Sequence, residues 1–316
     1  MIPIKGGRNN RAYKILYKGK ICFMKQYNIS SGYQRLEAEY SFLNHAIQCN
    51  SLHVTTPIFR NKKLGIGIYH YIEGNPYKKG DITNHDIQEA LKFISVINQD
   101  RSKPSAKTMQ RASEACFSIA EHIAQINNRL TKLSQMIPYD DIDYEAHHFI
   151  ENELKAAWSY LENKILKKEN PCHSFLNQKL DWEDRVISPS DFGFHNALKL
   201  PNEKVMFVDF EYSGWDDPAK LVGDFFNQIE IPVPIKYFTE FTENVSKLVY
   251  HSDEMIERTK LLLPLYSIKW CCIVLNYFLP DGKLQKEFVL PIKYEDRKLQ
   301  LQKAKLILKN LEVIND

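Results

Sequence analysis

The chain has 316 residues, of which 44% are hydrophobic and 26% charged. This composition is typical of a globular protein with room for one large domain or two packed lobes, and it excludes a disordered chain. Its 42 basic and 39 acidic residues leave a net charge of +3, which is too small to predict binding to nucleic acid or to a membrane surface. A local basic patch is still compatible with these totals.

The sequence carries no pattern of a targeting or membrane segment. The start, MIPIKGGRNN, lacks the basic and then apolar order of a signal peptide, and the longest apolar run, at 270–279, is well short of the ~20 residues that span a bilayer. We therefore expect a cytoplasmic protein. The six cysteines have no C-x-x-C spacing, which favours buried free thiols over a disulfide or a metal site.

The first elements are predicted to be strands. AYKILY (12–17) and KICFMKQY (20–27) alternate in side-chain direction and are separated by Lys18 and Gly19. This pattern predicts a β-hairpin with a two-residue turn. An extended run at the N-terminus precedes the hairpin.

A helix and two further strands complete the predicted small lobe, residues 1–72. Ser30 or Ser31 is expected to cap a helix that continues to about Ala46, with apolar residues at helical spacing. Extended runs follow at 56–60 and 64–72, before glycine and proline break the pattern.

The rest of the chain, residues 73–316, is predicted to be a larger and mainly helical lobe. An amphipathic helix at 85–98 is followed by two long helices, at about 108–134 and 141–167, which we expect to pack as a hairpin. Short strands are expected at 185–187 and 205–210, and helices again from Pro218. The predicted class is α+β.

Three polar residues in and after one short loop indicate phosphate chemistry. ISPSDFGFHNALKL (187–200) holds Asp191 and Asn196, and the apolar run KVMFVDF ends near Asp209. A carboxylate in such a loop can accept a hydroxyl proton, while an amide oxygen and a second carboxylate can bind Mg²⁺ beside nucleotide phosphates. The bland alternative is that Asp191 and Asn196 only form an Asx-turn. The residue types fit phosphoryl transfer, and we expect a catalytic loop at 187–211.

This pattern resembles the aminoglycoside phosphotransferase and choline kinase family, relatives of protein kinases. In that group a His-x-Asp-x-x-x-x-Asn loop precedes an apolar strand that ends in Ile/Val-Asp-Phe/Trp-Glu. The corresponding segments here are PSDFGFHN (189–196) and VDFE (208–211). The resemblance implies a bilobal protein-kinase-like fold, with a small antiparallel sheet and one helix before a helical lobe. It also implies ATP and Mg²⁺ as cofactors, Asp191 as the catalytic residue, and Asn196 and Asp209 as metal ligands.

One departure from the family pattern keeps an alternative open. Pro189 stands where the family has a histidine that buttresses the loop. A nucleotide-binding but catalytically inactive relative is therefore the competing hypothesis to an active kinase. A protein kinase is disfavoured, because no Ala-Pro-Glu segment and no long activation loop follow Asp209.

The resemblance extends to nucleotide-binding residues of the small lobe. Gly6 and Gly7 lie in a turn whose backbone N–H groups could approach phosphate oxygens. Lys25 closes the strand ICFMK, where a kinase-like fold keeps its phosphate-binding lysine. Because strand residues alternate, Phe23 shares a face with Lys25, and we expect it to line an adenine site.

The lysine needs an acidic partner from the following helix. Glu37 and Glu39 are the candidates, and the EYSFL pattern favours Glu39. The segment 68–77 resembles the hinge strand of the family, whose backbone at His70, Tyr71 and Ile72 would bind the adenine edge.

Two further residues near the loop have no assigned role. His195 follows the catalytic aspartate closely, but a packed or solvent-facing residue is at least as good an interpretation. Glu211 matches the acidic residue that the family carries after its metal ligand, although it could equally hold backbone N–H groups or a neighbouring arginine.

The phosphate acceptor is the partner that the residues identify least. We expect a small-molecule hydroxyl acceptor, no nucleic acid and no membrane, and a monomer or homodimer. Aminoglycosides, amino alcohols and sugars or polyols all fit the family, and a sugar or polyol is mildly preferred because nothing signals a cationic substrate. Glu114, Glu121 and Glu151 of the helical hairpin could serve such a ligand or simply face water.

Overall fold

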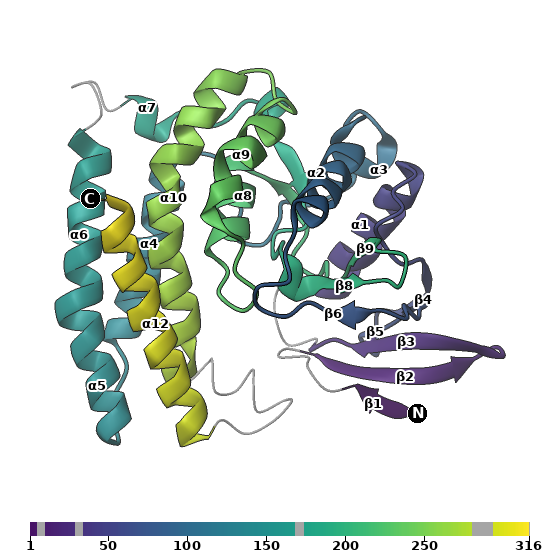
Figure 1. Cartoon of the computed structure of the whole chain (residues 1–316), viewed down its shortest axis with the longest axis horizontal. Helices are drawn as coiled ribbons and strands as arrows, with labels where there is room; N and C mark the ends of the chain where they lie inside the picture. Colours follow the sequence, from purple (N-terminus) through teal and green to yellow (C-terminus); the bar gives the residue numbers. More distant parts are fainter. Residues whose placement is uncertain (5–9, 29–33, 168–173, 280–292, 316) are drawn as a thin grey trace. The chain divides into compact units, whose positions relative to one another are not determined.

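The computed structural model describes residues 1–4, 10–28, 34–167, 174–279 and 293–315. It is α+β, as predicted, and divides into two compact units (Figure 1). Unit 1 comprises Met1–Ala115 and Asp181–Ile256, and unit 2 comprises Cys116–Leu180 and Glu257–Asp316. The predicted lobes, 1–72 and 73–316, remain a prediction, because these units divide the chain elsewhere.

Unit 1 contains a five-stranded antiparallel sheet in the order β1-β2-β3-β5-β4. The predicted hairpin is present, and Lys18 and Gly19 at its tip both have positive φ, 49° and 75°. Two such residues form the turn whose twist matches paired strands. The strands are β1 (Ile2–Ile4), β2 (Arg11–Tyr17), β3 (Lys20–Gln26), β4 (Pro57–Asn61) and β5 (Ile66–His70).

Helix α1 (Arg35–Gln48) follows β3, but it begins later than predicted. Its N-cap residue is Gln34, which makes no side-chain capping bond, so the predicted cap at Ser30 or Ser31 is wrong. Those two serines lie outside the described residues. Gly32 follows them in the sequence, and glycine in a helix costs about 1 kcal/mol relative to alanine, which disfavours a longer helix.

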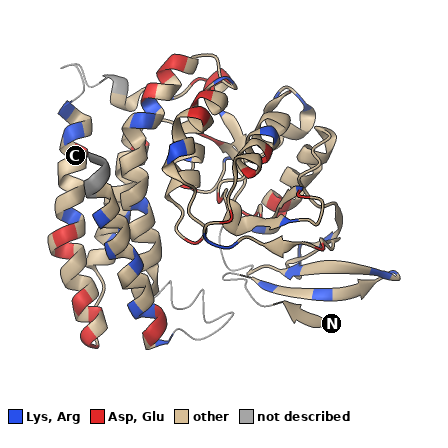
Figure 2. Cartoon of the chain, in the orientation of Figure 1, with Lys and Arg blue, Asp and Glu red and all other residues tan. Residues whose placement is uncertain are grey.

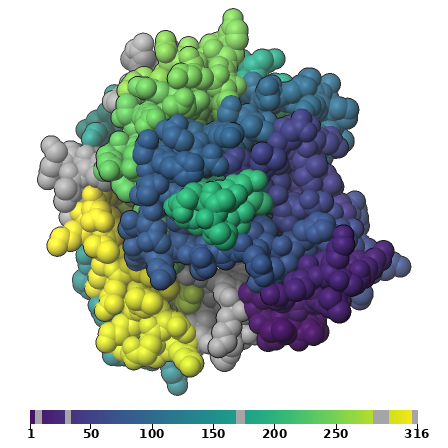
Figure 3. Space-filling model, turned by 45° about the vertical axis from the view of Figure 1, so that its right-hand side comes forward, coloured from purple at the N-terminus to yellow at the C-terminus, as the bar shows by residue number. Residues whose placement is uncertain are grey.

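The remainder of unit 1 combines helices with short strands around the predicted loop. The two strands predicted around that loop are present as β7 and β9. Strand β9 pairs with β8 and β7 pairs with β10, and neither partner strand was predicted. Figure 3 shows the turn between β8 and β9 in green, surrounded on this face by blue residues. Lys199 Nζ of β8 lies 3.6 Å from Asp86 Oδ1 of α2. The elements are β6 (Asn75–Pro76), α2 (Asn84–Asn98), α3 (Pro104–Lys107), β7 (Val186–Ser188), β8 (Ala197–Lys199), β9 (Val205–Phe207), β10 (Gly214–Asp216), α8 (Pro218–Asn227) and α9 (Phe238–Ser246), with 3₁₀ turns at Trp182–Asp184, Phe194–Asn196 and Ile235–Tyr237.

The segment before α4 is not helical, contrary to the prediction of a helix from residue 108. Ala112 donates its backbone N–H to Trp215 O at 2.9 Å, and Trp215 N–H bonds Gln110 O at 3.0 Å. These bonds attach the segment to β10 instead of closing a helical turn. Helix α4 begins at Ile119, where the hydroxyl of Ser118 caps it by accepting from Glu121 N–H at 3.2 Å.

Unit 2 is a bundle of helices, and its α4 and α6 pack together as the predicted hairpin. Trp158 Nε1 donates to Asn127 Oδ1 at 2.6 Å between them. The predicted helix at 141–167 is continuous, with one π-helical segment between α5 and α6. The elements are α4 (Ile119–Ser134), α5 (Asp141–Phe149), the π-helix (Ile150–Leu154), α6 (Lys155–Lys167), α7 (Ser174–Asn177), most of α10 (Ser252–Leu275), a 3₁₀ turn (Asn276–Phe278) and α12 (Tyr294–Asn315).

The structure bears on two expectations, that the chain has no membrane-spanning segment and that its cysteines are buried free thiols. One helical stretch, Ser252–Phe278, is long and apolar enough to cross a membrane, but 61% of its most apolar window is buried, as in a core helix. The cysteines at 22, 49, 116, 271 and 272 are buried free thiols, as predicted. Cys172 lies outside the described residues.

Candidate active site

Each of the two predicted aspartates is followed by a buried phenylalanine that anchors its loop. Phe192 packs against Phe225 of α8 with ring centroids 5.0 Å apart, and Phe210 stacks on Phe42 of α1 at 4.5 Å. Burying one such ring contributes about 1.5–3 kcal/mol. The Asp-Phe pairs therefore fix Asp191 and Asp209 at the edge of an aromatic core in unit 1.

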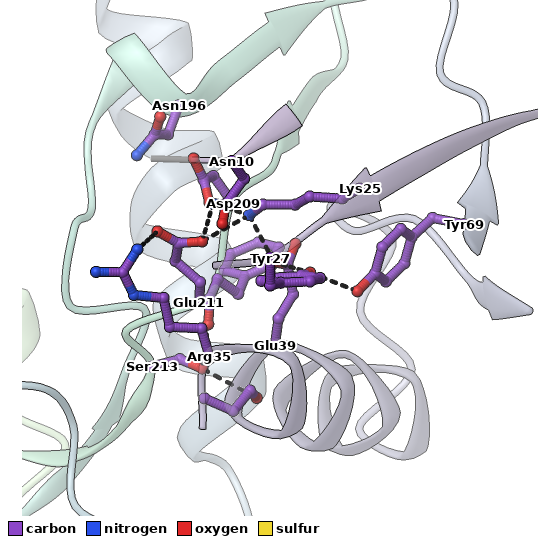
Figure 4. A network of polar contacts seen from close by, with 12 residues as sticks. Asn10, Lys25, Tyr27, Arg35, Glu39, Tyr69, Asn196, Asp209, Glu211 and Ser213 are labelled. Carbon is purple, nitrogen blue, oxygen red and sulfur yellow. Dashed lines mark hydrogen bonds and ion pairs between the residues drawn. The ribbon is translucent and has the colours of Figure 1, made fainter. Parts of the chain in front are cut away.

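The side chain of Lys25 lies at the centre of a carboxylate cluster. Its Nζ is 2.8 Å from Glu39 Oε2, 2.5 Å from Asp209 Oδ1 and 3.1 Å from Glu211 Oε2 (Figure 4). Lys25 is only 5% exposed. The strand, the helix and the loop that carry these residues were predicted separately, and the structure brings their side chains together.

The acidic partner of Lys25 is Glu39, the preferred one of the two candidates. Glu39 is buried, whereas Glu37 points to basic side chains elsewhere: its carboxylate lies 2.7 Å from Lys62 Nζ and 3.4 Å from Arg60 Nε. Residues two positions apart on a helix face different directions. Only Glu39 can therefore hold the Lys25 ammonium in place.

These two glutamates form a matched pair for mutagenesis. We expect Glu39→Gln to raise the KM for ATP at least tenfold, because the Lys25 ammonium loses its buried anionic partner. Glu37→Gln removes only half-buried ion pairs that do not involve Lys25, so its KM should stay within about twofold of the parent. Steady-state kinetics of both variants measures this, and a larger effect of Glu37→Gln would contradict the assignment.

Two tyrosines, which the sequence analysis did not single out, support Glu39. Tyr27 Oη donates to Glu39 Oε2 at 2.6 Å, and the hydroxyls of Tyr27 and Tyr69 are 2.6 Å apart. The Tyr69 ring lies across Gly67, where a Cβ atom would collide with it. Tyr27 follows Lys25 by two residues, directly after the end of β3, and this spacing is the signal that could have identified it.

The second side of the cluster is built by Glu211, whose role was left open. Its carboxylate is 3.5 Å from Arg35 Nη1 and accepts a hydrogen bond from the Asn10 amide. Glu211 therefore pairs with a neighbouring arginine, which was one of the alternatives for its role. Asn10 and Arg35 are buried, but neither has a spacing in the sequence that would have predicted its place.

The charges of this cluster shift the pKa of each group. Burial lowers the pKa of the Lys25 ammonium, but the surrounding carboxylates raise it more, and it lies well above its ordinary value. Burial raises the pKa of the Asp209 carboxyl, and Lys25 only partly opposes this effect. For Glu211, burial is outweighed by Lys25 and Arg35, which lower its pKa. Asp209 is therefore the carboxylate that takes up a proton more readily as pH falls.

The donor set fits a divalent cation. Oxygen atoms of Glu39, Asp209 and Glu211 lie within 4.8 Å of one another. Three carboxylates against the charges of Lys25 and Arg35 leave one net negative charge, which a hard cation with oxygen ligands would compensate.

Asn196, the other predicted ligand, is adjacent to Asp209 through the β8–β9 hairpin. Val208 N–H donates to Asn196 O at 2.9 Å, at the end of the ladder that pairs Ala197 with Phe207. Among the described residues, the hydrogen bonds of its side chain are donated by Nδ2, so Oδ1 is the atom that could bind a cation.

Asp191 is hydrogen-bonded on both sides within its own loop. His195 Nε2 lies 3.0 Å from Asp191 Oδ1, and Asn196 Nδ2 is 3.2 Å from Oδ2. His195 was not assigned to the site from the sequence. A Cβ on Gly193 would lie 2.8 Å from His195 Nδ1, so only glycine leaves room for this ring. The histidine therefore orients the carboxylate and does not simply face solvent.

The predicted nucleotide-base residues lie at the end of β5. Phe23 faces Tyr69 with ring centroids 6.3 Å apart, on the same face of the sheet as Lys25. The backbone of His70 is already hydrogen-bonded, since its N–H donates to Thr56 O and its carbonyl accepts from the Thr55 hydroxyl. Tyr71 and Ile72, the other two residues predicted for the adenine edge, follow directly after β5.

The predicted phosphate turn cannot be described, because Gly6 and Gly7 lie outside the described residues. The strands on either side, β1 and β2, pair antiparallel. The hairpin β2–β3 carries basic side chains and no acidic one (Figure 2). The hairpin is therefore locally basic, although the chain as a whole is nearly neutral.

The three glutamates proposed for the acceptor differ in their surroundings. Glu121 accepts from the backbone N–H of Phe117 at 2.6 Å, and Glu151 pairs with Lys155 at 2.7 Å, so both have structural partners inside unit 2. Glu114 belongs to unit 1, next to Ser113, whose carbonyl accepts a 3.4 Å hydrogen bond from Ser190. Only Glu114 is therefore near the predicted loop in the same unit.

Comparison with known proteins identifies similar folds but no sequence relative. The sequence matches no protein-family model, and no curated protein is significantly similar to it. Among solved structures, a spectinomycin phosphotransferase in complex with ADP and spectinomycin is 16% identical, with a TM-score of 0.64, covering 98% of this chain and 92% of its own. A choline kinase from Cryptosporidium parvum is 13% identical, with a TM-score of 0.57, covering 99% and 90%.

A third similar structure contains a nucleotide and a divalent cation. It is an amicoumacin kinase in complex with AMP-PNP and Ca²⁺, 14% identical with a TM-score of 0.55, covering 96% of this chain and 87% of its own. At such identities the likeness concerns the fold. It confirms the predicted protein-kinase-like fold and the structural resemblance to aminoglycoside phosphotransferases and choline kinases.

Proposed function

We propose that this protein is an ATP- and Mg²⁺-dependent small-molecule kinase that transfers the γ-phosphate of ATP to a hydroxyl group. The observation that carries the proposal is the cluster in which Lys25 contacts Glu39 of α1 and Asp209 of the loop after β9. Such a lysine positions nucleotide phosphates, and such an aspartate binds the metal that bridges them. The similar fold of solved phosphotransferases supports the proposal.

Each residue of the candidate site has a role in this reaction. Asp191 accepts the proton of the acceptor hydroxyl as its oxygen forms a bond to the γ-phosphorus and the bond to the β,γ-bridging oxygen of ATP breaks, which releases ADP. His195 and Asn196 each bond one oxygen of Asp191 and so orient the carboxylate, whose oxygens each have a second lone pair for the acceptor hydroxyl. Lys25, held by Glu39, orients the phosphates. Mg²⁺, bound by Asn196 and Asp209, would neutralise charge on the phosphates.

The position of the adenine base and the class of the phosphate acceptor are also part of the proposal. We place the adenine between Phe23 and the backbone at Tyr71 and Ile72, with Gly6 and Gly7 as the phosphate turn. The acceptor is a small molecule with a hydroxyl group, for which a sugar or polyol is preferred over an aminoglycoside or amino alcohol. We further propose a cytoplasmic monomer or homodimer that acts without nucleic acid or membrane.

The test is ³¹P NMR of the purified protein with ATP and Mg²⁺ and pooled hydroxyl acceptors. The pools contain sugars and polyols, aminoglycosides, choline and ethanolamine, and hydroxy amino acids. We expect a new phosphoester signal in one pool, growing with that of ADP. A signal that grows equally without enzyme or without Mg²⁺ would contradict the proposal.

The competing function is a nucleotide-binding relative without activity, and Pro189 is the feature that favours it. ATP that stays intact in every pool, with a protein that binds nucleotide by calorimetry, would support this alternative. Loss of nucleotide binding altogether would exclude both.

A further inference from the structure

The residue before Asp191 has an unusual backbone conformation. Ser190 has a φ of +68°, and Asp191 N–H donates to Pro189 O at 3.0 Å. A hydrogen bond between residues two apart, around a residue with positive φ, is a γ-turn of the rare and strained form. For a residue other than glycine such a conformation costs on the order of 1–3 kcal/mol and persists only where the surroundings hold it.

A buried lysine from another element holds this serine. Lys220 lies in the first turn of α8 and is only 1% exposed. Its Nζ donates to Ser190 Oγ at 2.9 Å and to Asp216 Oδ2 at 2.6 Å, and lies 3.5 Å from Asp224 Oδ2. The ammonium therefore makes two short hydrogen bonds, and Asp224 adds a longer ion pair.

The other contacts of Ser190 come from the backbone and from its own loop. Its N–H donates to Ser188 Oγ at 3.0 Å, and its hydroxyl donates to Ser113 O over a long 3.4 Å. The Lys220 bond is the short, charge-assisted contact of the side chain, and such bonds are about twice as strong as neutral ones.

Stability alone does not account for this arrangement. A buried ion pair gains little over apolar residues of similar size, because both charges lose their hydration. Asp216 lies on β10, which pairs with β7 directly before the loop. The pair thus places a cation at a fixed point relative to the strand that enters the loop, where it can restrain Ser190.

We propose that Lys220 is a positioning residue for the catalytic loop: through its hydrogen bond to Ser190 Oγ it holds the strained turn that aims the Asp191 carboxylate at the acceptor hydroxyl. Its catalytic consequence rests on the proposed kinase function. The restraint itself is a property of the free protein and can be measured without any activity.

The first measurement is hydrogen–deuterium exchange of the peptide that covers 188–196, in protein without nucleotide. Ser190→Gly removes the hydroxyl and also removes the cost of positive φ, so the fold should keep its melting temperature within a few degrees. We expect the exchange of this peptide to rise at least tenfold. Ser246→Ala is the matched control, because it deletes another buried serine hydroxyl of unit 1, in α9, and should leave the peptide unchanged.

A second variant tests the lysine itself. Lys220→Met alone leaves the buried carboxylate of Asp216 without its cation and is expected to unfold readily. The double variant Lys220→Met with Asp216→Asn avoids this charge, and we expect the same rise in exchange at 188–196. If the double variant does not fold, Ser190→Gly decides the question.

Kinetics then separates positioning from simple support of the fold. With an identified acceptor, Ser190→Gly should lower kcat at least tenfold and leave the KM for ATP within twofold. Unchanged exchange in Ser190→Gly would overturn the restraint, whether or not the parent is active, and raised exchange with an unchanged kcat would overturn the positioning role. Raised exchange in a protein whose parent phosphorylates nothing would support the restraint and refute the proposed function.

Discussion

Replacing Asp191 by asparagine is expected to lower kcat for phosphate transfer by about 10²–10⁴-fold, the range that a general base contributes. The asparagine amide keeps the size of the side chain and can still meet His195, which lies 3.0 Å from Asp191 Oδ1. It cannot accept the hydroxyl proton. The fold and the loop should therefore persist while the chemical step slows.

Nucleotide binding distinguishes this effect from a damaged site. Asp191 does not contact Lys25, Glu39 or Asp209 in any hydrogen bond or ion pair that the described residues show, so the affinity for ATP with Mg²⁺ should stay within about threefold. The measurement is kcat with the identified acceptor, together with a calorimetric titration of ATP.

The matched control is Asp253→Asn, an exposed aspartate in the first turn of α10. It removes the same charge away from the loop and should leave kcat unchanged. Turnover by Asp191→Asn at the parental rate would remove Asp191 from the catalytic step, whatever the other residues do.

Local patterns in the sequence were sufficient to predict most elements of unit 1. The β2–β3 hairpin follows from alternation and a Lys-Gly turn. Pro218 was predicted to begin a helix, and α8 begins there, where Ala219 N–H donates to the Asp217 carboxylate at 2.7 Å. These signals depend on residues that are close in the chain. They fail where partners are distant.

The two errors in helix boundaries have such a cause. Residues 110–112 were predicted to be helical from their spacing, but they exchange backbone hydrogen bonds with Trp215, about a hundred residues away. The cap of α1 was predicted at serine from composition, yet the helix begins at Arg35 without a side-chain cap. The periodicity of one segment does not indicate whether its backbone forms hydrogen bonds with a distant segment.

Some residues of the candidate site were predicted from motifs, and others were not. Lys25, Glu39 and Asp209 were chosen from motifs, and the structure brings them into contact. Asn10, Arg35 and Lys220 were not, because each acts through a single side chain whose partner is distant in the sequence. Tyr27 is close to Lys25 in the sequence, but no motif singled it out.

Asp209→Asn is expected to abolish the strengthening of nucleotide binding by Mg²⁺. The carboxylate is the predicted metal ligand, and its side chain is 42% exposed and thus accessible to a ligand. An amide carries no charge to hold a hard cation beside phosphates. We expect the affinity for ATP with Mg²⁺ to fall at least tenfold, measured by calorimetry, while Asp181→Asn, an exposed aspartate of unit 1, has no effect.

The affinity of Asp209→Asn for ATP should not fall when metal is absent. This difference distinguishes a metal ligand from a residue that only supports the fold. Asp209 Oδ1 is 2.5 Å from Lys25 Nζ and would compete with phosphate oxygens for that ammonium. Removing its charge releases Lys25, so ATP in the presence of EDTA should bind Asp209→Asn as tightly as the parent or more tightly. A variant that loses affinity equally with Mg²⁺ and with EDTA would show that Asp209 supports the fold of the site and does not bind the cation.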